Sequence, residues 1–118
     1  MRRLLILVTA ACLTATAAYA HHNYALFDRE HPVSLEGDVE RVVFANPHVI
    51  LALHSGDTTY SVEWGNLQQM RRWNVNPDTV VAGDHLIVTG SAPKDRTDHR
   101  LSILTAIRRP SDGWSWGR

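Results

Sequence analysis

The amino-acid sequence predicts an all-β protein with one short helix, arranged as an OB-like five-stranded barrel in the order β-β-β-α-β-β. Apolar and polar side chains alternate over several segments after Val33, as half-buried strands require. Two of these segments pair in a single hairpin register, and a capped helical segment follows them. An open antiparallel sheet with one packed helix is the alternative fold.

The first strand is expected to begin at Val33 and to bend. One face of this strand carries Val33, Leu35, Gly37 and Val39. The alternation then changes parity, because Val42 and Phe44 are also apolar. A parity change within a strand indicates a bulge or a bend. Long bent first strands are typical of barrels that curl on themselves.

A β-hairpin is predicted after the break at Asn46-Pro47. With a two-residue turn at Gly56-Asp57, every inward residue of the second strand faces an inward residue of the third. The facing pairs are Leu53 with Tyr60, Leu51 with Val62, and Val49 with Trp64. This agreement supports the register, since a slip of one residue would turn each side chain to the other face.

A short helix is expected next, followed by two more strands. Asn66 is a candidate N-cap with Gln69 three residues later, and Asn74 can take the left-handed conformation that ends a helix. The fourth strand is predicted over 85–91 and the fifth over 100–109, ending before Pro110. The residues expected on one face of the fifth strand are Leu101, Ile103 and Ile107.

Both ends of the chain differ in composition from the predicted barrel domain over residues 33–110. Residues 1–20 resemble a signal peptide, with a basic start, an apolar run and a small-residue cleavage site at Ala18-Tyr19-Ala20. A retained anchor helix and a lipidated Cys12 are alternatives. Residues 21–32 form a lead-in, and the 111–118 tail carries Trp114 and Trp116, which either dock on the barrel or a partner or stay disordered.

The predicted location is therefore the periplasm or the exterior, with no membrane span after processing. Composition narrows the function classes further. The 118 residues contain 12 Lys plus Arg and 12 Asp plus Glu, so a broad positive surface for nucleic acid is not expected. The single Cys excludes an intramolecular disulfide. No Ser-His-Asp spacing, phosphate-binding loop or HExxH helix occurs in the sequence.

The candidate chemistry lies on histidines. Cleavage after Ala20 would make His21 the first residue, whose amine and imidazole can together chelate copper, zinc or nickel. His48 shares the outer sheet face with Glu63, which lies diagonally across the hairpin. The predicted metal ligands are His21, His22, His48 and Glu63. The alternative for His48 is a structural one, in which it caps a turn or orients Glu63.

A non-enzymatic binding module that holds copper through these residues is the leading hypothesis. The second hypothesis is a protein- or glycan-binding adaptor that uses the barrel face and the Trp-bearing tail. A copper oxidase or oxygenase ranks last, because nothing in the sequence supplies a substrate pocket.

The motifs also resemble a known family. They are His21-His22-Asn23-Tyr24-Ala25, Phe27-Asp28, Asn46-Pro47-His48, Glu63-Trp64-Gly65, Gly83-Asp84 and the segment from Val88 to Asp95. Together they resemble a family of small secreted bacterial proteins of unknown function, whose mature chains begin with a His-His-Ser-Phe-Ala-like segment and carry an Asn-Pro-His motif. The resemblance implies export and a small β domain, and it supplies no activity.

Overall fold

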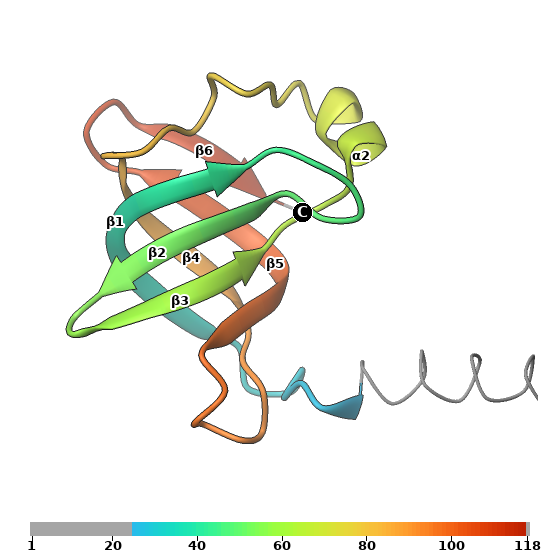
Figure 1. Cartoon of the computed structure of the whole chain (residues 1–118), viewed down its shortest axis with the longest axis vertical. Coiled ribbons are helices and arrows are strands. Elements are labelled where there is room, and N and C mark those ends of the chain that lie inside the picture. The colour runs from blue at the N-terminus through green and yellow to red at the C-terminus, as the bar shows by residue number, and fades with distance from the viewer. Residues whose placement is uncertain (1–24, 118) are drawn as a thin grey trace, which may run out of the picture.

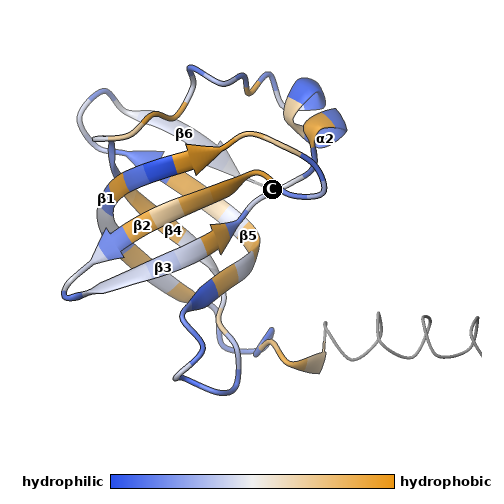
Figure 2. Ribbon diagram, viewed as in Figure 1, coloured by the Kyte–Doolittle hydropathy of each residue, from blue (hydrophilic) through white to orange (hydrophobic). Residues whose placement is uncertain are grey.

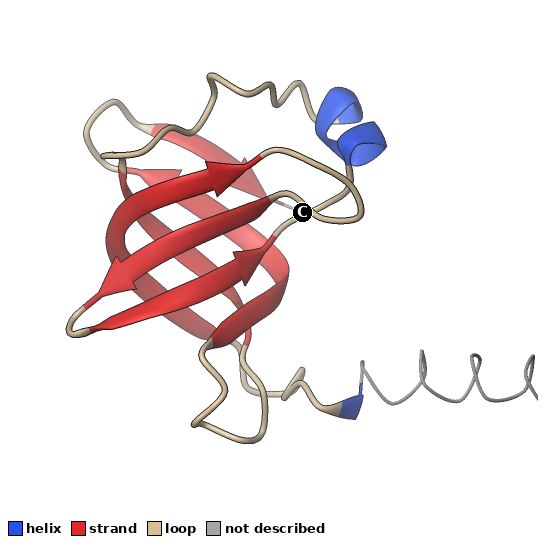
Figure 3. Ribbon diagram, in the orientation of Figure 1, coloured by secondary structure: helices blue, strands red, loops and turns tan. Residues whose placement is uncertain are grey.

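A computed structural model describes residues 25–117 of the chain. The expected all-β class with one short helix is confirmed (Figures 1 and 3). The strands are β1 (Val33–Val43), β2 (Ile50–Ser55), β3 (Thr58–Glu63), β4 (His85–Ser91), β5 (Arg100–Arg109) and β6 (Trp114–Gly117), and the helix is α2 (Leu67–Arg72). Polar residues gather in the β2–β3 turn and the β4–β5 loop (Figure 2).

The sheet closes into a barrel. Its strand order is β3-β2-β1-β4-β5-β6, and β3 also pairs with β5. This last pairing is parallel, with Ser61 opposite Arg100 and Val62 opposite Leu101. Five strands therefore form a closed barrel and β6 is an extra strand on β5, so the alternative of an open sheet is wrong.

The bend in β1 lies where the parity change predicted it. The register between β1 and β2 shifts between Val39 and Arg41, which identifies a bulge at Glu40. Gly37 is buried, and a Cβ at this position would overlap the carbonyl oxygen of His54 on β2. Glycine is therefore required here by the close approach of the two strands.

The β2–β3 hairpin register is confirmed. Leu53 pairs with Tyr60, Leu51 with Val62 and Ile50 with Glu63. The pairing continues past the strand ends, because the N–H of Trp64 donates to the carbonyl of Val49 at 2.8 Å. The inward residues of β2 are almost completely buried, as the alternation required.

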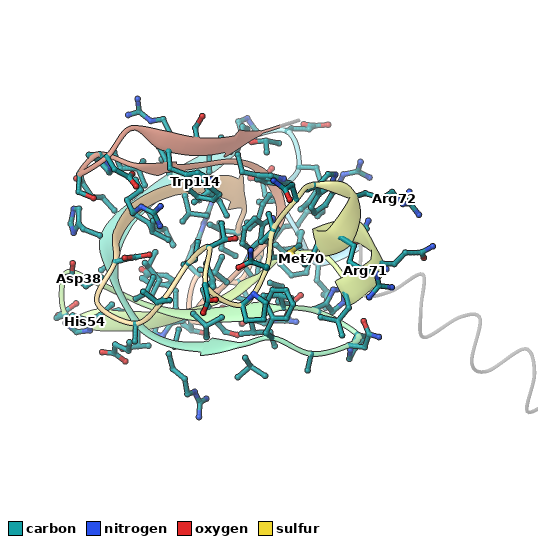
Figure 4. All side chains as sticks on the ribbon, turned by 90° about the horizontal axis from the view of Figure 1, so that it is seen from above. Asp38, His54, Met70, Arg71, Arg72 and Trp114 are labelled. Carbon is teal, nitrogen blue, oxygen red and sulfur yellow. The ribbon has the colours of Figure 1, made fainter. Side chains whose placement is uncertain are left out.

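The helix begins and ends as expected. Asn66 and Gln69 form a reciprocal capping box, and Asn74 has a φ of 56° just beyond the helix. Met70 is fully buried in the core, whereas Arg71 and Arg72 extend from the helix into solvent (Figure 4). Leu67 also packs against the core, so two apolar side chains anchor a short helix whose other residues are polar.

The predicted inner face of β5 is wrong at Ile103. The buried apolar residues of β5 are Leu101, Leu104 and Ile107, with exposed fractions of 0–2%. The register between β4 and β5 shifts between Thr89 and Ser91, and Ile103 on β5 has a φ of 51°. A second bulge thus changes the parity within β5, which a strict alternation of residues does not anticipate.

The expected C-terminal tail contributes a strand. Trp114–Gly117 pairs with β5, so the tail docks on its own barrel. Trp116 is 8% exposed and its ring centre lies 4.9 Å from that of Trp73 and 5.3 Å from that of Trp64. Arg109 stacks over the Trp114 ring at 5.2 Å, which covers the other indole of this strand.

Candidate functional site

Two of the predicted site residues, His48 and Glu63, line the same pocket. This pocket of about 270 Å³ lies where β3 passes into α2, and residues of β5 and β6 complete its wall. His48 is exposed and the side chain of Glu63 is 21% exposed, so both lie at the rim. Trp64 and Trp116 are 6% and 8% exposed and form the floor. The site therefore combines polar rim groups with an aromatic interior.

Backbone pairing and a side-chain contact both fix the position of His48. Val49, the next residue, donates its N–H to the carbonyl of Gly65 at 2.8 Å. Two residues earlier, the Asn46 Oδ1 atom accepts a hydrogen bond from the N–H of Leu67 at 2.9 Å. The Asn-Pro-His corner is thus tied to both the end of β3 and the start of α2. The Asn46–Pro47 peptide bond is cis.

Glu63 lies beside a cation that is already engaged. The Nη1 atom of Arg100 is 3.8 Å from Glu63 Oε1, which is longer than a hydrogen bond. The same guanidinium donates to both carboxylate oxygens of Asp98 at 2.6–3.0 Å. These hydrogen bonds hold the pKa of Asp98 below its usual range. Asp98 is therefore the closer partner of Arg100.

The lead-in packs close to this arginine. Phe27 forms an isolated β-bridge with Pro93, and the N–H of Asp28 donates to the carbonyl of Ala92 at 2.9 Å. The guanidinium carbon of Arg100 lies 5.2 Å from the centre of the Phe27 ring. Arg100 therefore lies close to both the lead-in and Glu63.

The described residues supply two of the four predicted metal ligands. His21 and His22 lie outside the described residues. Within 25–117, no group of three His, Cys, Asp or Glu side chains is arranged to hold a metal ion. His54, near the end of β2 that is remote from His48, contacts Thr59 at 3.3 Å and Glu40 at 3.4 Å. The other two predicted ligands, His21 and His22, precede the part of the chain that the structure describes.

Two features of the pocket are not predicted from the sequence. Trp64 Nε1 is buried and has no hydrogen-bond partner. Ile103, whose side chain also lines the pocket, has the left-handed φ of 51° that β-branched residues rarely adopt. The parity of Trp64 predicted its burial, but a missing acceptor has no signature in the sequence. The bulge that turns Ile103 depends on the pairing of β5 with β4.

Comparison with known proteins gives one match. A family model described as "Family of unknown function (DUF6152)" matches residues 9–102. No curated protein and no solved structure matches the chain. In the part of the chain that the structure describes, no helix has the length and apolar character needed to cross a membrane.

Proposed function

The chain belongs to the DUF6152 family of unknown function, and from this premise we propose that it is an exported small binding module for a transition metal ion, copper first. His21, His22 and His48 would hold the ion, with Glu63 in the coordination shell or next to it. One observation carries the proposal: His48 and Glu63, predicted together from the sequence, line one pocket. No catalytic residue is proposed.

The ligand chemistry favours copper. Neutral imidazole and amine nitrogens bind Cu(II) more tightly than they bind the other common divalent first-row metals. Cleavage after Ala20 would free the α-amine of His21, which can close a chelate with its own imidazole. Because His48 would add a further nitrogen, the predicted donor set is rich in nitrogen and has one carboxylate beside it.

The contacts of the lead-in with β5 support this proposal. Phe27 contacts Arg100, and Arg100 lies 3.8 Å from Glu63. Residues 21–24 separate the proposed new N-terminus from the described chain, and an extended segment of this length reaches about 14 Å. The anchoring of Phe27 therefore starts this segment from the side of the barrel that carries Glu63.

A Cu(II) competition titration of the mature protein tests the proposal. We expect submicromolar binding that weakens at least about tenfold in His48→Ala, since one nitrogen ligand is lost. His54→Ala is the matched control, because His54 lies on β2, the strand that follows His48, but does not line the pocket. Binding weaker than micromolar, or equal losses in the two variants, would contradict the proposal.

The adaptor alternative now has less apolar surface to use. Trp116 is buried in the core, and Trp114 is half-buried beneath Arg109. A partner would then have to bind the outer barrel face. Deletion of the tail does not test this alternative cleanly, because the deletion also removes β6.

A further inference from the structure

A second pocket, here called the outer pocket, lies on the outer face of the barrel. Its volume is about 270 Å³, and residues of β1, β2, β3 and the loop between β4 and β5 line it. No residue lines both the outer pocket and the pocket of His48 and Glu63. A ligand in the outer pocket would therefore use a different set of side chains from the proposed metal ion.

The outer pocket is hollow because small side chains lie in the middle of this face. Ala52 of β2 pairs with Arg41 of β1 on one side and with Ser61 of β3 on the other. Because side chains alternate along a strand, the neighbours of Ala52 on the same face of β2 are Ile50 and His54, and both are larger. The small side chains of Ala52 and Ser61 therefore form a floor between larger neighbours.

Part of this lining is apolar and open to solvent. Val43 is 40% exposed and pairs with Ile50, which is half-buried. Ala52, which follows Ile50 on the same face, is also half-buried. Covering such surface with an apolar group is favourable. The outer pocket thus offers accessible apolar surface to a ligand.

Arg41 adds a cation that the chain itself does not use. In the part of the chain that the structure describes, the Arg41 guanidinium has neither a hydrogen bond nor an ion pair. By contrast, Arg96, Arg100 and Arg109 each lie 2.6–3.8 Å from an aspartate oxygen. Among the described residues, no Asp or Glu lines the outer pocket. Since a guanidinium can bind a carboxylate through two parallel hydrogen bonds, this lining favours a carboxylate ligand.

The neighbouring carboxylate of Glu40 is engaged elsewhere. Its Oε1 atom lies 3.4 Å from Nδ1 of His54 and accepts a hydrogen bond of 3.4 Å from the hydroxyl of Thr59. His54 and Thr59 face each other across β2 and β3, so Glu40 is held over this pair, at one end of the hollow. A ligand anion is therefore expected beside Arg41 rather than beside Thr59.

The side of the outer pocket formed by β3 supplies further hydrogen-bond donors. The rings of Tyr60 and His99 meet edge to face with their centres 5.5 Å apart, and both residues line the outer pocket. The carbonyl of His99 accepts a hydrogen bond of 2.9 Å from the N–H of Ser61, which fixes the backbone here. An imidazole carries an N–H donor in every tautomer, and a phenol carries an O–H.

We propose that the outer pocket binds a small monocarboxylic acid with a flat apolar body, of the benzoate class. The carboxylate would accept hydrogen bonds from Arg41, and the ring would cover Ala52 beside Val43 and Ile50. The pocket spans three strands, about 10 Å, and a cavity of about 150 Å³ already holds a benzene ring. This inference goes beyond the proposed metal binding and does not rest on it, because the two pockets share no residue.

Titration of the ¹⁵N-labelled mature protein with sodium benzoate, followed by NMR, tests the proposal. The protein is first dialysed against EDTA, so that a metal-bound carboxylate cannot account for the result. We expect a dissociation constant of about 1 mM, which suits a ligand of this size. The backbone amides of Ala52 and Ser61 should shift most. Benzamide, which has the same ring and no charge, should bind at least about 5-fold more weakly.

Two variants test the two halves of the outer pocket. In Arg41→Gln, affinity for benzoate should fall about 5- to 10-fold, because the charged donor is lost. Arg108→Gln is the matched control, since Arg108 is an exposed arginine on a strand that does not line the outer pocket. Ala52→Leu keeps Arg41 but fills the floor, so it should weaken binding at least about tenfold.

Several results would overturn the proposal. They are shifts that do not saturate by about 50 mM benzoate, equal affinities in Arg41→Gln and Arg108→Gln, or benzamide or inorganic phosphate bound as tightly as benzoate. Largest shifts at Trp64 and Ser102 would also overturn it, because they would place the acid in the pocket of His48 and Glu63. If Ala52→Leu does not fold, the comparison of the two arginine variants still decides.

Discussion

The side-chain oxygen of Asn46 accepts a hydrogen bond of 2.9 Å from the backbone N–H of Leu67, the first residue of α2. The loop that carries His48 is thereby joined to the helix that begins at the pocket. Leu67 would otherwise have a free N–H, since the first N–H groups of a helix have no partner within it. One interaction thus supports both the helix and the position of the rim histidine.

We expect Asn46→Ala to lower both stability and metal affinity. Loss of the acceptor should reduce the free energy of unfolding by about 1 kcal/mol, as measured by urea denaturation. Cu(II) affinity should fall as well, because the corner that holds His48 loses its link to α2.

The matched control is Asn76→Ala. The Asn76 side chain accepts a hydrogen bond of 2.8 Å from the N–H of Asp78, in a turn that does not line the pocket. This variant should lose a comparable stability and keep its Cu(II) affinity. Equal losses of affinity in the two variants would show that Asn46 acts only on overall stability.

Trp116→Ala tests whether β6 is part of the core. Its ring packs against Trp64 and Trp73, so truncation should lower the free energy of unfolding by about 3–5 kcal/mol. Ser115→Ala, an exposed position on the same strand, should change it by less than about 0.5 kcal/mol. Similar stabilities of the two variants in chemical denaturation would mean that residues 114–117 do not support the barrel.

Gly90→Ala is expected to disturb the wall of the pocket, because Gly90 lies against two residues that line it. A Cβ on Gly90 would lie 2.7 Å from the carbonyl oxygen of Ser102 and 2.9 Å from Leu104 Cδ2. Overpacking of this kind costs about 1–3 kcal/mol. The Trp64 indole resonance should also move, because Ser102 and Leu104 line the same pocket. In Gly56→Ala, a turn position with open space around it, that resonance should stay in place.

The pH dependence of stability should reflect His85. Hydrogen bonds from its imidazole to Asp38 at 2.7 Å and to Glu36 at 3.1 Å raise the pKa of His85 above its usual 6.5. The folded state then binds the proton more tightly, so this stabilisation is complete below about pH 6.5 and disappears as the pH rises through the raised value. His85→Gln should therefore lower the urea midpoint at pH 5.5 and leave it almost unchanged at pH 9. An equal effect at both pH values would refute the ionic contribution.

Local patterns predicted most of the fold. The alternation from Val33, the turn at Gly56-Asp57 and the capping pair Asn66 and Gln69 each act within a few residues, and all three are confirmed. The predicted inner face of β5 is wrong at Ile103, because this residue lies at a bulge that depends on the pairing of β5 with β4. The sequence does not decide whether the tail docks on the barrel or is disordered, because only tertiary packing places Trp116 in the core.

The site is also predicted only in part, because some of its contacts join residues that are far apart in the sequence. The hairpin register placed Glu63 diagonally across from His48, and the structure has both along one pocket. The contribution of Asn46 was not anticipated, because its partner Leu67 is 21 residues away in the sequence. The contact of Arg100 with Phe27 joins the lead-in to β5 and leaves no local pattern either.

Electron paramagnetic resonance of the Cu(II)-loaded mature protein tests the metal site most directly. We expect nitrogen hyperfine structure that loses one nitrogen contribution in His48→Ala. It should lose another in a variant with two residues added before His21, because the amine of His21 is then an amide and is no longer available as a ligand. A spectrum that stays the same in both variants would place the copper elsewhere and contradict the proposed site.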